Sequence, residues 1–550
     1  MQGLDTETLQ MTLEAIGDFA SRELHDERLI ELDEADEYPA ELIRRMCSDE
    51  LGIQLLFIAE EHGGMGGSAY DVYRVCERMA RIDLGVATSV LATFLGSDPI
   101  LMGGTDEQQH RWMSRIANEG LLMAYGATEA EAGSDLGSLK TVAIPVEEGG
   151  EVVGYRITGQ KQWISNGAVA DLYSILATTD KGPTWFILEK GLEGFSSAAP
   201  ENKHGIRLSN TAALYLDDVH VGADALVGTE LGQGLVQAQQ VFGYTRLMVA
   251  AFGLGGGWEA LDRAIRYSRE RIQAGGPLSE KQGYTHKLIV PHVLRLEAGR
   301  AYIEETAERI DEGTHGHLNT EGAIAKYVAT EAGNDAADAA IQALGGYGYT
   351  HDYMVEKIRR DVRITTIYEG TSEIMEMTIA RDRWQQHLKS RGAHYHDQAA
   401  ELERVHATHP TIGADLAALA HHAIAELLEA ARVARLTRNQ HVLFSLGRLL
   451  AEVEAAAALV RRARRAADGE LPDKTDGRFD AAGLATLSRA HARRVASQVA
   501  EQGAALVVSA GGAEDPAALV EAIGGARILA AQAGGLADLD RAADVIYGRV

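Results

Sequence analysis

One carboxylate lies in a setting that suits contact with a substrate: Glu369, between Tyr368 and Gly370 in the stretch IRRDVRITTIYEGTSEIMEM at 358–377. A positioned carboxylate can accept a proton from a reacting group, which makes this residue a candidate general base. A solvated surface glutamate requires neither an aromatic residue before it nor a glycine after it, whereas a glutamate that reaches a substrate uses both. The structural alternative is that Glu369 only holds its loop, through an ion pair with one of the nearby arginines Arg359, Arg360 and Arg363.

Two further segments combine hydroxyl groups, small residues and an aromatic ring. In YGATEAEAGSD at 125–135, Thr128, Ser134 and the nearby backbone N–H groups are candidate donors to a polar, anionic ligand. In QKQWISNGA at 160–168, Trp163 lies close to Ser165, and an aromatic plane beside a hydroxyl donor suits a planar heterocycle. Each segment alone is more often a turn than a site, but together they indicate a binding site in one sheet domain.

Arginines and a glycine pair mark a third region. YSRERIQAGGPLSEKQG at 267–283 carries Arg269 and Arg271 before a glycine-rich break. These arginines either form a solvated helix face or clamp a pyrophosphate through its paired oxygens. The segment AIQALGGYGY adds Gln342 with Gly345 and Gly346, and a glycine pair after a helix allows the close approach of a ligand or of another backbone.

Three other patterns favour structural roles. GLGGG at 253–257 follows a helical pattern and not a strand, so we expect helix packing through small residues rather than a phosphate-binding loop. HYHD at 394–397 has no supporting carboxylates, and Cys47 and Cys76 have no partner at ligand spacing, so no metal site is expected. The basic run RRARR at 461–465 predicts a solvated helix face rather than a contact with acidic lipid.

The elements that must position these residues follow a simple order. Apolar residues recur at helical spacing over 1–120, short strand-like runs occupy 121–235, and helical spacing returns over 236–390. Strands in one continuous block indicate an antiparallel β domain between helical domains, not a parallel βαβ fold. Residues 391–550 are Ala-rich and predict a further helical domain. The expected fold class is mainly α with a central antiparallel β domain.

Composition narrows the class of protein. The 550 residues carry a net charge of -28, which argues against non-specific nucleic-acid binding, because that binding neutralises phosphates with basic side chains. Two cysteines allow no disulfide framework, and the N-terminus lacks the pattern of a secretory signal. No uninterrupted apolar run has the length that a membrane span needs. We expect a cytoplasmic protein that contacts neither nucleic acid nor membrane.

Five motifs, in order over about residues 5–385, resemble those of the acyl-CoA dehydrogenase family of flavoproteins. They are YGATEAEAGSD, GQKQWISNG, ERIQAGG, IQALGGYGYTHDYMVEKIRRD and IYEGTSEI. The resemblance implies a helical domain, a central β domain and a second helical domain, with FAD as cofactor. The tail from residue 391 is similar in placement to the extra C-terminal helical domain of the longer family members.

The resemblance also implies roles for individual residues. Contacts to the flavin fall to Tyr125, Ala127, Thr128, Trp163 and Ser165, and Thr371 closes the cofactor site. Contacts to the adenosine-diphosphate half, across a subunit interface, fall to Arg271, Gln273, Gln282, Gln342, Gly345 and Gly346. Contacts to the substrate fall to Ser134, Arg246, Tyr368 and Gly370. The family places its catalytic base at one of two positions, here Glu369 and Thr245, and only Glu369 is a carboxylate.

The reaction that this resemblance implies is α,β-dehydrogenation of an acyl-CoA thioester to the 2-enoyl-CoA. Glu369 would abstract the α-proton, flavin N5 would accept the β-hydride, and the electrons would pass to an electron-transfer flavoprotein. Residues that reach a neighbour's cofactor imply a homodimer or a homotetramer. The alternatives are an acyl-CoA oxidase or desulfinase-like flavoenzyme, and a non-catalytic, flavin-bearing relative associated with DNA.

Overall fold

The chain divides into two compact units. The computed structural model describes residues 3–48, 50–313, 316 and 318–549, without the side chains of 241 and 242. Unit 1 comprises Met1–Met248, Ala307–Asn319 and Arg360–Ile364, and unit 2 comprises Val249–Thr306, Thr320–Arg359 and Thr365–Val550. The residues considered above are therefore shared between the two units, and each unit is described by itself.

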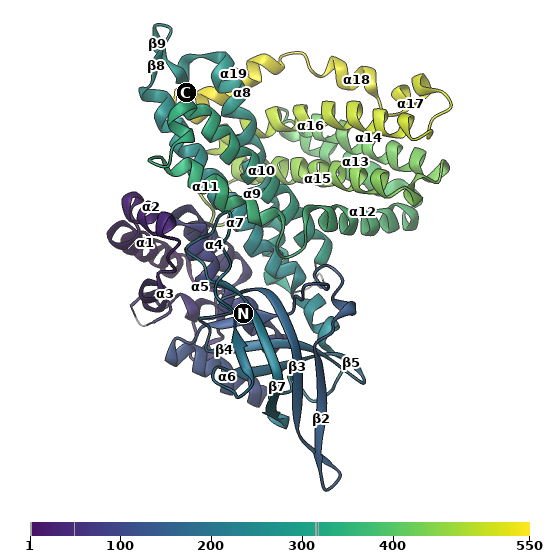
Figure 1. Cartoon of the computed structure of the whole chain (residues 1–550). Helices are drawn as coiled ribbons and strands as arrows, with labels where there is room; N and C mark the ends of the chain where they lie inside the picture. Colours follow the sequence, from purple (N-terminus) through teal and green to yellow (C-terminus); the bar gives the residue numbers. More distant parts are fainter. Residues whose placement is uncertain (1–2, 49, 314–315, 317, 550) are drawn as a thin grey trace. The chain divides into compact units, whose positions relative to one another are not determined.

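Helices α1 to α6 open unit 1 (Figure 1). Their bounds are α1 Thr6–Glu23, α2 Asp26–Ala35, α3 Ala40–Met46, α4 Ala69–Ile82, α5 Leu84–Gly103 and α6 Asp106–Glu119. α4 begins at a capping box in which the side chains of Ser68 and Asp71 each bond the other's backbone N–H. By length and composition α5 is apolar enough to cross a membrane, but 89% of its most apolar window is buried. A helix that is apolar on all sides is typical of a protein core.

A curled sheet of seven strands follows these helices in unit 1. Its strands are β1 Met123–Gly126, β2 Val142–Glu148, β3 Glu151–Ser165, β4 Leu172–Thr179, β5 Gly182–Glu189, β6 Phe195–Ser197 and β7 Thr211–Gly222. The order across the sheet is β1-β4-β2-β3-β7-β6, and β5 pairs with β4. Apolar side chains such as Ile157, Ile175, Phe186 and Leu214 are buried together on one face. The predicted order of helices, strands and helices is confirmed.

The sheet is mixed rather than wholly antiparallel. β1 pairs with β4 in parallel, and β2 meets β4 in parallel through Val142 and Thr178. The longer pairings, β2 with β3, β3 with β7 and β4 with β5, are antiparallel. In the chain, the β2–β3 hairpin comes between β1 and β4. In the sheet, β4 lies between β1 and β2 and is parallel to both. β2 is also mostly exposed and contains Pro145, so its period-two signal in the sequence is weak.

Long helices form the framework of unit 2. α7, Gly234–Glu270, starts in unit 1 and continues into unit 2, followed by α8 Gln282–Leu288, α9 Val290–Glu312, α10 Asn319–Leu344, α11 Met354–Val362 and α12 Ser372–Lys389. A Cβ added at Gly253 or at Gly257 would lie 2.6 Å from a Cα atom of α10. The glycines of GLGGG therefore allow two helix backbones to approach closely, as the sequence predicts.

The tail of the chain adds more helices to unit 2. They are α13 Ala393–Thr408, α14 Ala414–Val433, α15 Gln440–Asp468, α16 Ala481–Ser509, α17 Pro516–Ala522, α18 Gly525–Ala530 and α19 Gly535–Tyr547. α12, α13, α14, α15 and α16 pack side by side in Figure 1. α14 contributes the apolar stripe of Ile424, Leu427, Leu428 and Ala431, and all four side chains are buried. The helical tail predicted from the Ala-rich sequence is present.

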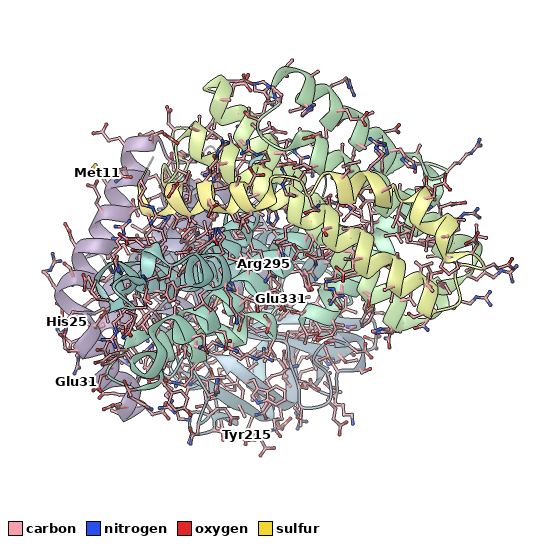
Figure 2. The ribbon with its side chains drawn as sticks, turned by 90° about the horizontal axis from the view of Figure 1, so that it is seen from above. Met11, His25, Glu31, Tyr215, Arg295 and Glu331 are labelled. Atoms are coloured by element: carbon pink, nitrogen blue, oxygen red, sulfur yellow. The ribbon has the colours of Figure 1, made fainter. Side chains whose placement is uncertain are left out.

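Buried ion pairs join α15 to α9. Arg462, only 5% exposed, pairs with Glu297 at 2.7 Å and with Glu304 at 2.9 Å. Arg295, labelled in Figure 2, contacts Glu452 at 3.6 Å. The prediction of a solvated face for RRARR is wrong at Arg462, because the acidic side chains of α9 draw this arginine into the interior of unit 2.

Candidate active site

Unit 1 brings together the two loops that the sequence singles out beside the sheet. Gln162 N–H donates to the carbonyl of Thr128 at 2.9 Å. Lys161 Nζ donates to the carbonyl of Ala127 at 3.2 Å and to Glu129 Oε1 at 2.8 Å. The loop after β1 and the end of β3 therefore lie side by side.

The ion pair between Lys161 and Glu129 anchors these two segments. Lys161 is fully buried and Glu129 is 7% exposed. Glu129 also accepts from the backbone N–H groups of Lys140 and Thr141, at 2.7 and 3.0 Å. Burial lowers the pKa of Lys161 to about 8. Burial acts to raise the pKa of Glu129. The hydrogen bonds from Lys161, Thr141 and Lys140 outweigh this effect and hold the pKa of Glu129 below its ordinary value.

A β-bulge turns the indole of Trp163 outward. The pairing of β3 with β7 shifts between Lys161 and Ile164, and Trp163 has a φ of 56°. Without the bulge, alternation would place its side chain on the buried face that carries Lys161. Instead Trp163 is 59% exposed, while Thr128 and Ser165 are half-buried. An exposed indole beside hydroxyl groups fits a planar ring system such as a flavin.

The other flavin and substrate candidates of unit 1 differ in exposure. Tyr125 is half-buried, with its ring centroid 4.7 Å from that of Trp185, and Ala127 is buried. Ser134 lies exposed in the loop between β1 and β2. Arg246 is 5% exposed and donates to Asn319 Oδ1 at 2.6 Å, so its role as a substrate contact stays a prediction.

Unit 2 contains a pocket of about 530 Å³ that is lined by four of the remaining candidates. Its lining residues are Tyr267, Arg271, Leu278, Gln342, Ala343, Leu344, Gly345, Gly346, Tyr347 and Thr350. Four of these residues, Arg271, Gln342, Gly345 and Gly346, are predicted contacts of the adenosine-diphosphate half. Segments about seventy residues apart in the sequence, at the end of α7 and after α10, therefore meet at this pocket.

The chemistry of this pocket suits an anionic nucleotide. With the Gln273 amide oriented so that its oxygen faces the guanidinium of Arg271, the oxygen accepts from Nη2 at 2.8 Å and from Nε at 3.3 Å. The guanidinium carbon of Arg271 lies 5.9 Å from the ring centroid of Tyr347. A Cβ added at Gly345 or Gly346 would meet no atom within 4 Å, so the surface there is open. A fixed positive charge, an amide and exposed rings fit the pyrophosphate and adenine of FAD.

Two of the candidates for the adenosine-diphosphate half, Gln273 and Gln282, are not among the residues that line the pocket. Gln282 lies on α8, and its Nε2 donates to Asp540 Oδ1 of the tail at 2.8 Å. The sequence contains no local signal for this pairing, because 258 residues separate the two side chains.

The loop that carries Glu369 has an unusual backbone. Glu369 has a φ of 54° and Gly370 a φ of 90°, both in the left-handed region. The φ of Gly370 favours glycine, and an added Cβ would also displace the terminal methyl of Met375, which lies 2.6 Å away. The fully buried Lys326 donates from Nζ to the carbonyl of Gly370 at 2.5 Å. This contact holds the loop in a conformation that is otherwise strained.

The start of α12 fixes the residues that directly follow Gly370. The hydroxyl oxygen of Thr371 caps the helix by accepting from the backbone N–H of Ile374, at 3.4 Å. Ser372 donates to Glu331, which is labelled in Figure 2. Tyr368 and Glu369 are half-buried, and they precede the cap directly. These tertiary contacts fix the backbone that directly follows Glu369.

Two of the three arginines considered as partners of Glu369 pair with other carboxylates. Arg359 contacts Asp338 at 3.3 Å, and Arg360 contacts Asp33 at 2.7 Å. Thr245, the alternative position of a base, is buried and 1% exposed.

Sequence reasoning missed four residues that hold the candidate segments in place through hydrogen bonds. They are Lys161, Glu129, Lys326 and Asp540. A lysine at an inward position of β3 does signal a buried partner, because an ammonium group is buried only when it is paired. Among the residues that the structure describes, no group of three or more His, Cys, Asp or Glu side chains is arranged to hold a metal ion.

Family comparisons agree with these observations over most of the chain. Models of the acyl-CoA dehydrogenase N-terminal, middle and C-terminal domains match residues 6–120, 124–219 and 232–383. An acyl-CoA dehydrogenase of Bacillus subtilis is 35% identical over 383 residues, which cover 68% of this chain and 98% of that protein.

Solved structures show the same fold. A chain from a structural study of the electron-transferring flavoprotein of Acidaminococcus fermentans and flavin-based electron bifurcation is 34% identical. It has a TM-score of 0.64 and covers 69% of this chain and 98% of that chain. An acyl-CoA dehydrogenase from Bacillus anthracis, complexed with FAD, covers 100% of this chain and 97% of that chain, with a TM-score of 0.81 and 21% identity. That last likeness shows that the fold, tail included, occurs in another protein. The chain belongs to the acyl-CoA dehydrogenase family of FAD-dependent oxidoreductases.

Proposed function

We propose that the protein oxidises an acyl-CoA thioester to the 2-enoyl-CoA with Glu369 as the general base. The observation that carries the proposal is the conformation of Glu369, which is left-handed, half-buried and held by Lys326 through the carbonyl of Gly370. Strain of this kind in a non-glycine residue is characteristic of functional sites. The family membership supports the same assignment.

Each residue of the site has a separate role in the proposed reaction. Glu369 takes the α-proton as a general base, from a site in which the bound acyl chain excludes water. The backbone N–H of Glu369 is the proposed donor to the thioester oxygen, where it stabilises negative charge that develops as the proton leaves. Gly370, without a Cβ, lets the thioester lie against the backbone, and Tyr368 borders the acyl chain. FAD, when bound, supplies the acceptor for the β-hydride.

The protein holds FAD with two separate sets of side chains in this proposal. Trp163, Thr128 and Ser165 of unit 1 contact the flavin, and Arg271 and Gln342 of unit 2 contact the adenosine-diphosphate half. The unit 2 pocket is open to solvent, and its key residues Arg271, Gln342, Gly345 and Gly346 are exposed. Such an open surface supports a homodimer or homotetramer in which a second copy completes the cofactor site.

The proposed electron acceptor is an electron-transfer flavoprotein. The support is the likeness to a chain solved in a study of such a flavoprotein. A cytoplasmic location is also proposed, because Cys47 and Cys76 are both buried free thiols, which suits a reducing compartment.

Anaerobic titration of the holoenzyme with a panel of acyl-CoA esters tests the reaction, because the flavin absorbance bleaches when a substrate reduces it. We expect bleaching with at least one straight or branched acyl-CoA, and reoxidation by electron-transfer flavoprotein without oxygen uptake. Oxygen consumption on addition of the same substrate would favour an oxidase. No bleaching with any acyl-CoA, from a protein that retains FAD, would contradict the proposal.

A further inference from the structure

The last helix of the chain, α19, contacts several segments that form or flank the unit 2 pocket. At the end of α7, the hydroxyl of Tyr547 lies 2.8 Å from Ser268 Oγ, and Arg269 Nη2 donates to the carbonyl of Tyr547 at 3.2 Å. Ser268 and Arg269 lie between Tyr267 and Arg271, which both line the pocket. The tail therefore holds the part of α7 that presents Arg271.

A second contact reaches the turn after the hairpin of β8, Ile272–Gln273, and β9, Gly276–Pro277. Arg549, just beyond α19, donates from Nη1 to the carbonyl of Ser279 at 3.0 Å. The residue before Ser279 is Leu278, which lines the pocket and donates its N–H to the carbonyl of Arg271 at 3.0 Å. The C-terminal segment thus supports both sides of the hairpin that follows Arg271.

The third contact is made by Asp540 and involves α8. A single carboxylate oxygen, Oδ1, accepts from Gln282 Nε2 at 2.8 Å and lies 3.1 Å from His286 Nε2. The hydrogen bond from Gln282, together with His286, holds the pKa of Asp540 below its ordinary value, so the acceptor is an ionised carboxylate. Figure 1 shows α19 beside α8, next to the hairpin.

α8 in turn is bonded to the pocket wall. Tyr284, between Gln282 and His286, donates from its hydroxyl to the carbonyl of Ala343 at 3.1 Å. Ala343 lines the pocket and precedes the glycine pair by two residues. A continuous set of hydrogen bonds therefore runs from Asp540 through α8 to the segment that carries Gln342, Gly345 and Gly346.

We propose that Asp540 is a positioning residue for the nucleotide half of the cofactor, and that the tail helix α19 belongs to the cofactor-binding apparatus. Asp540 acts through Gln282 and α8, which it aligns with the pocket wall, and not by contact with the ligand. The inference rests on the proposed function for the identity of the ligand. The competing role for Asp540 is to fasten α19, with no effect on the pocket.

Binding of FAD and of ADP to the full-length apoprotein distinguishes these roles. Flavin fluorescence quenching gives the Kd for FAD, and calorimetry gives the Kd for ADP, which probes the pocket without the flavin. Asp540→Ala should raise both Kd values about 3- to 10-fold, because a hydrogen-bonded support is lost. Asp540→Asn keeps an acceptor oxygen and should recover most of the affinity. Arg541→Ala, an exposed change on the same helix, is the matched control and should bind as the parent does.

Two further variants test which hydrogen bonds connect α19 to the pocket. Gln282→Ala and Asp540→Ala both remove the hydrogen bond between these two residues, so their losses of affinity should be less than additive in the double variant. Tyr547→Phe removes only the hydroxyl contact with Ser268, and it should weaken ADP binding about 2- to 5-fold even if Asp540→Ala fails to fold.

Parent-like Kd values for FAD and ADP in Asp540→Ala, with only a lower melting temperature, would overturn the inference and leave the proposed function intact. A parent apoprotein that binds no FAD would overturn the cofactor assignment and the inference with it.

Discussion

Glu369 adopts a left-handed backbone conformation that costs a non-glycine residue on the order of 1–3 kcal/mol. Its Gln variant keeps the size and the hydrogen-bonding capacity of the side chain but cannot accept a proton. We expect Glu369→Gln to fold and to hold FAD, while substrate bleaches its flavin about 10²–10⁴-fold more slowly, or slower still. Anaerobic stopped-flow absorbance on samples matched for flavin content measures this rate.

A neighbouring carboxylate provides the control for that measurement. Glu373 lies exposed in the first turn of α12, four positions after Glu369. Glu373→Gln removes the same charge from the same region and should bleach at the parent rate. If Glu369→Gln also bleaches at the parent rate, Glu369 is not the base and its loop has a structural role.

Lys161 supports the end of β3 that carries Trp163 through a buried charge pair with Glu129. Lys161→Met leaves the Glu129 carboxylate buried without its ammonium partner, so we expect a loss of about 3–5 kcal/mol in the free energy of unfolding. The double variant Lys161→Met, Glu129→Met removes both charges and should recover much of that loss. Urea unfolding curves of the single and double variants test this coupling, and equal losses in both would contradict it.

At the scale of elements, Glu454 of α15 joins the tail to the framework helices of unit 2. It accepts from Arg383 of α12 at 2.6 and 2.8 Å, and from the hydroxyls of Tyr302 and Tyr395. Burial acts to raise the pKa of Glu454, but the charge of Arg383 and these hydrogen bonds lower it from 4.5 to about 2. A carboxyl group with a depressed pKa stabilises the folded state fully above its unfolded pKa, and this stabilisation is lost as the pH falls.

Glu454→Gln should therefore destabilise unit 2 near neutral pH and lose less stability on acidification than the parent. The stabilisation from Glu454 is present above about pH 4.5 and disappears as the pH falls toward about 2. Thermal unfolding followed by circular dichroism across this window measures the difference between the two proteins. Parallel curves of melting temperature against pH would show that Glu454 does not contribute in this way.

At the scale of the whole molecule, the open pocket of unit 2 leads to a prediction about assembly. The 59.1 kDa chain should form a dimer or a tetramer in light scattering, with FAD bound in proportion to the number of chains. Arg271→Ala should weaken FAD binding, because the guanidinium is the fixed positive charge of the pocket. A monomer that retains FAD in full would contradict the shared cofactor site.

Much of the architecture was predictable because its signals are local. Helical spacing over 1–120 and beyond 236, and strand-like runs such as LYSILATT at 172–179, predict elements that the structure contains. The sequence motifs grouped Arg271, Gln342, Gly345 and Gly346 as one set of candidates, and these four residues line one cavity. The parallel pairing of β1 with β4 was not predictable, because strand direction in a sheet depends on contacts between distant segments.

The sequence by itself determined the order of the elements, the family and the identity of the one candidate base, since periodicity, motif order and side-chain chemistry are all written along the chain. Only the tertiary structure decided that Trp163 faces outward at a bulge, that Lys326 holds the strained loop of Glu369, and that Asp540 reaches Gln282. These features rest on backbone conformations and on contacts between residues as far as 258 positions apart, and no local pattern of residues encodes such contacts.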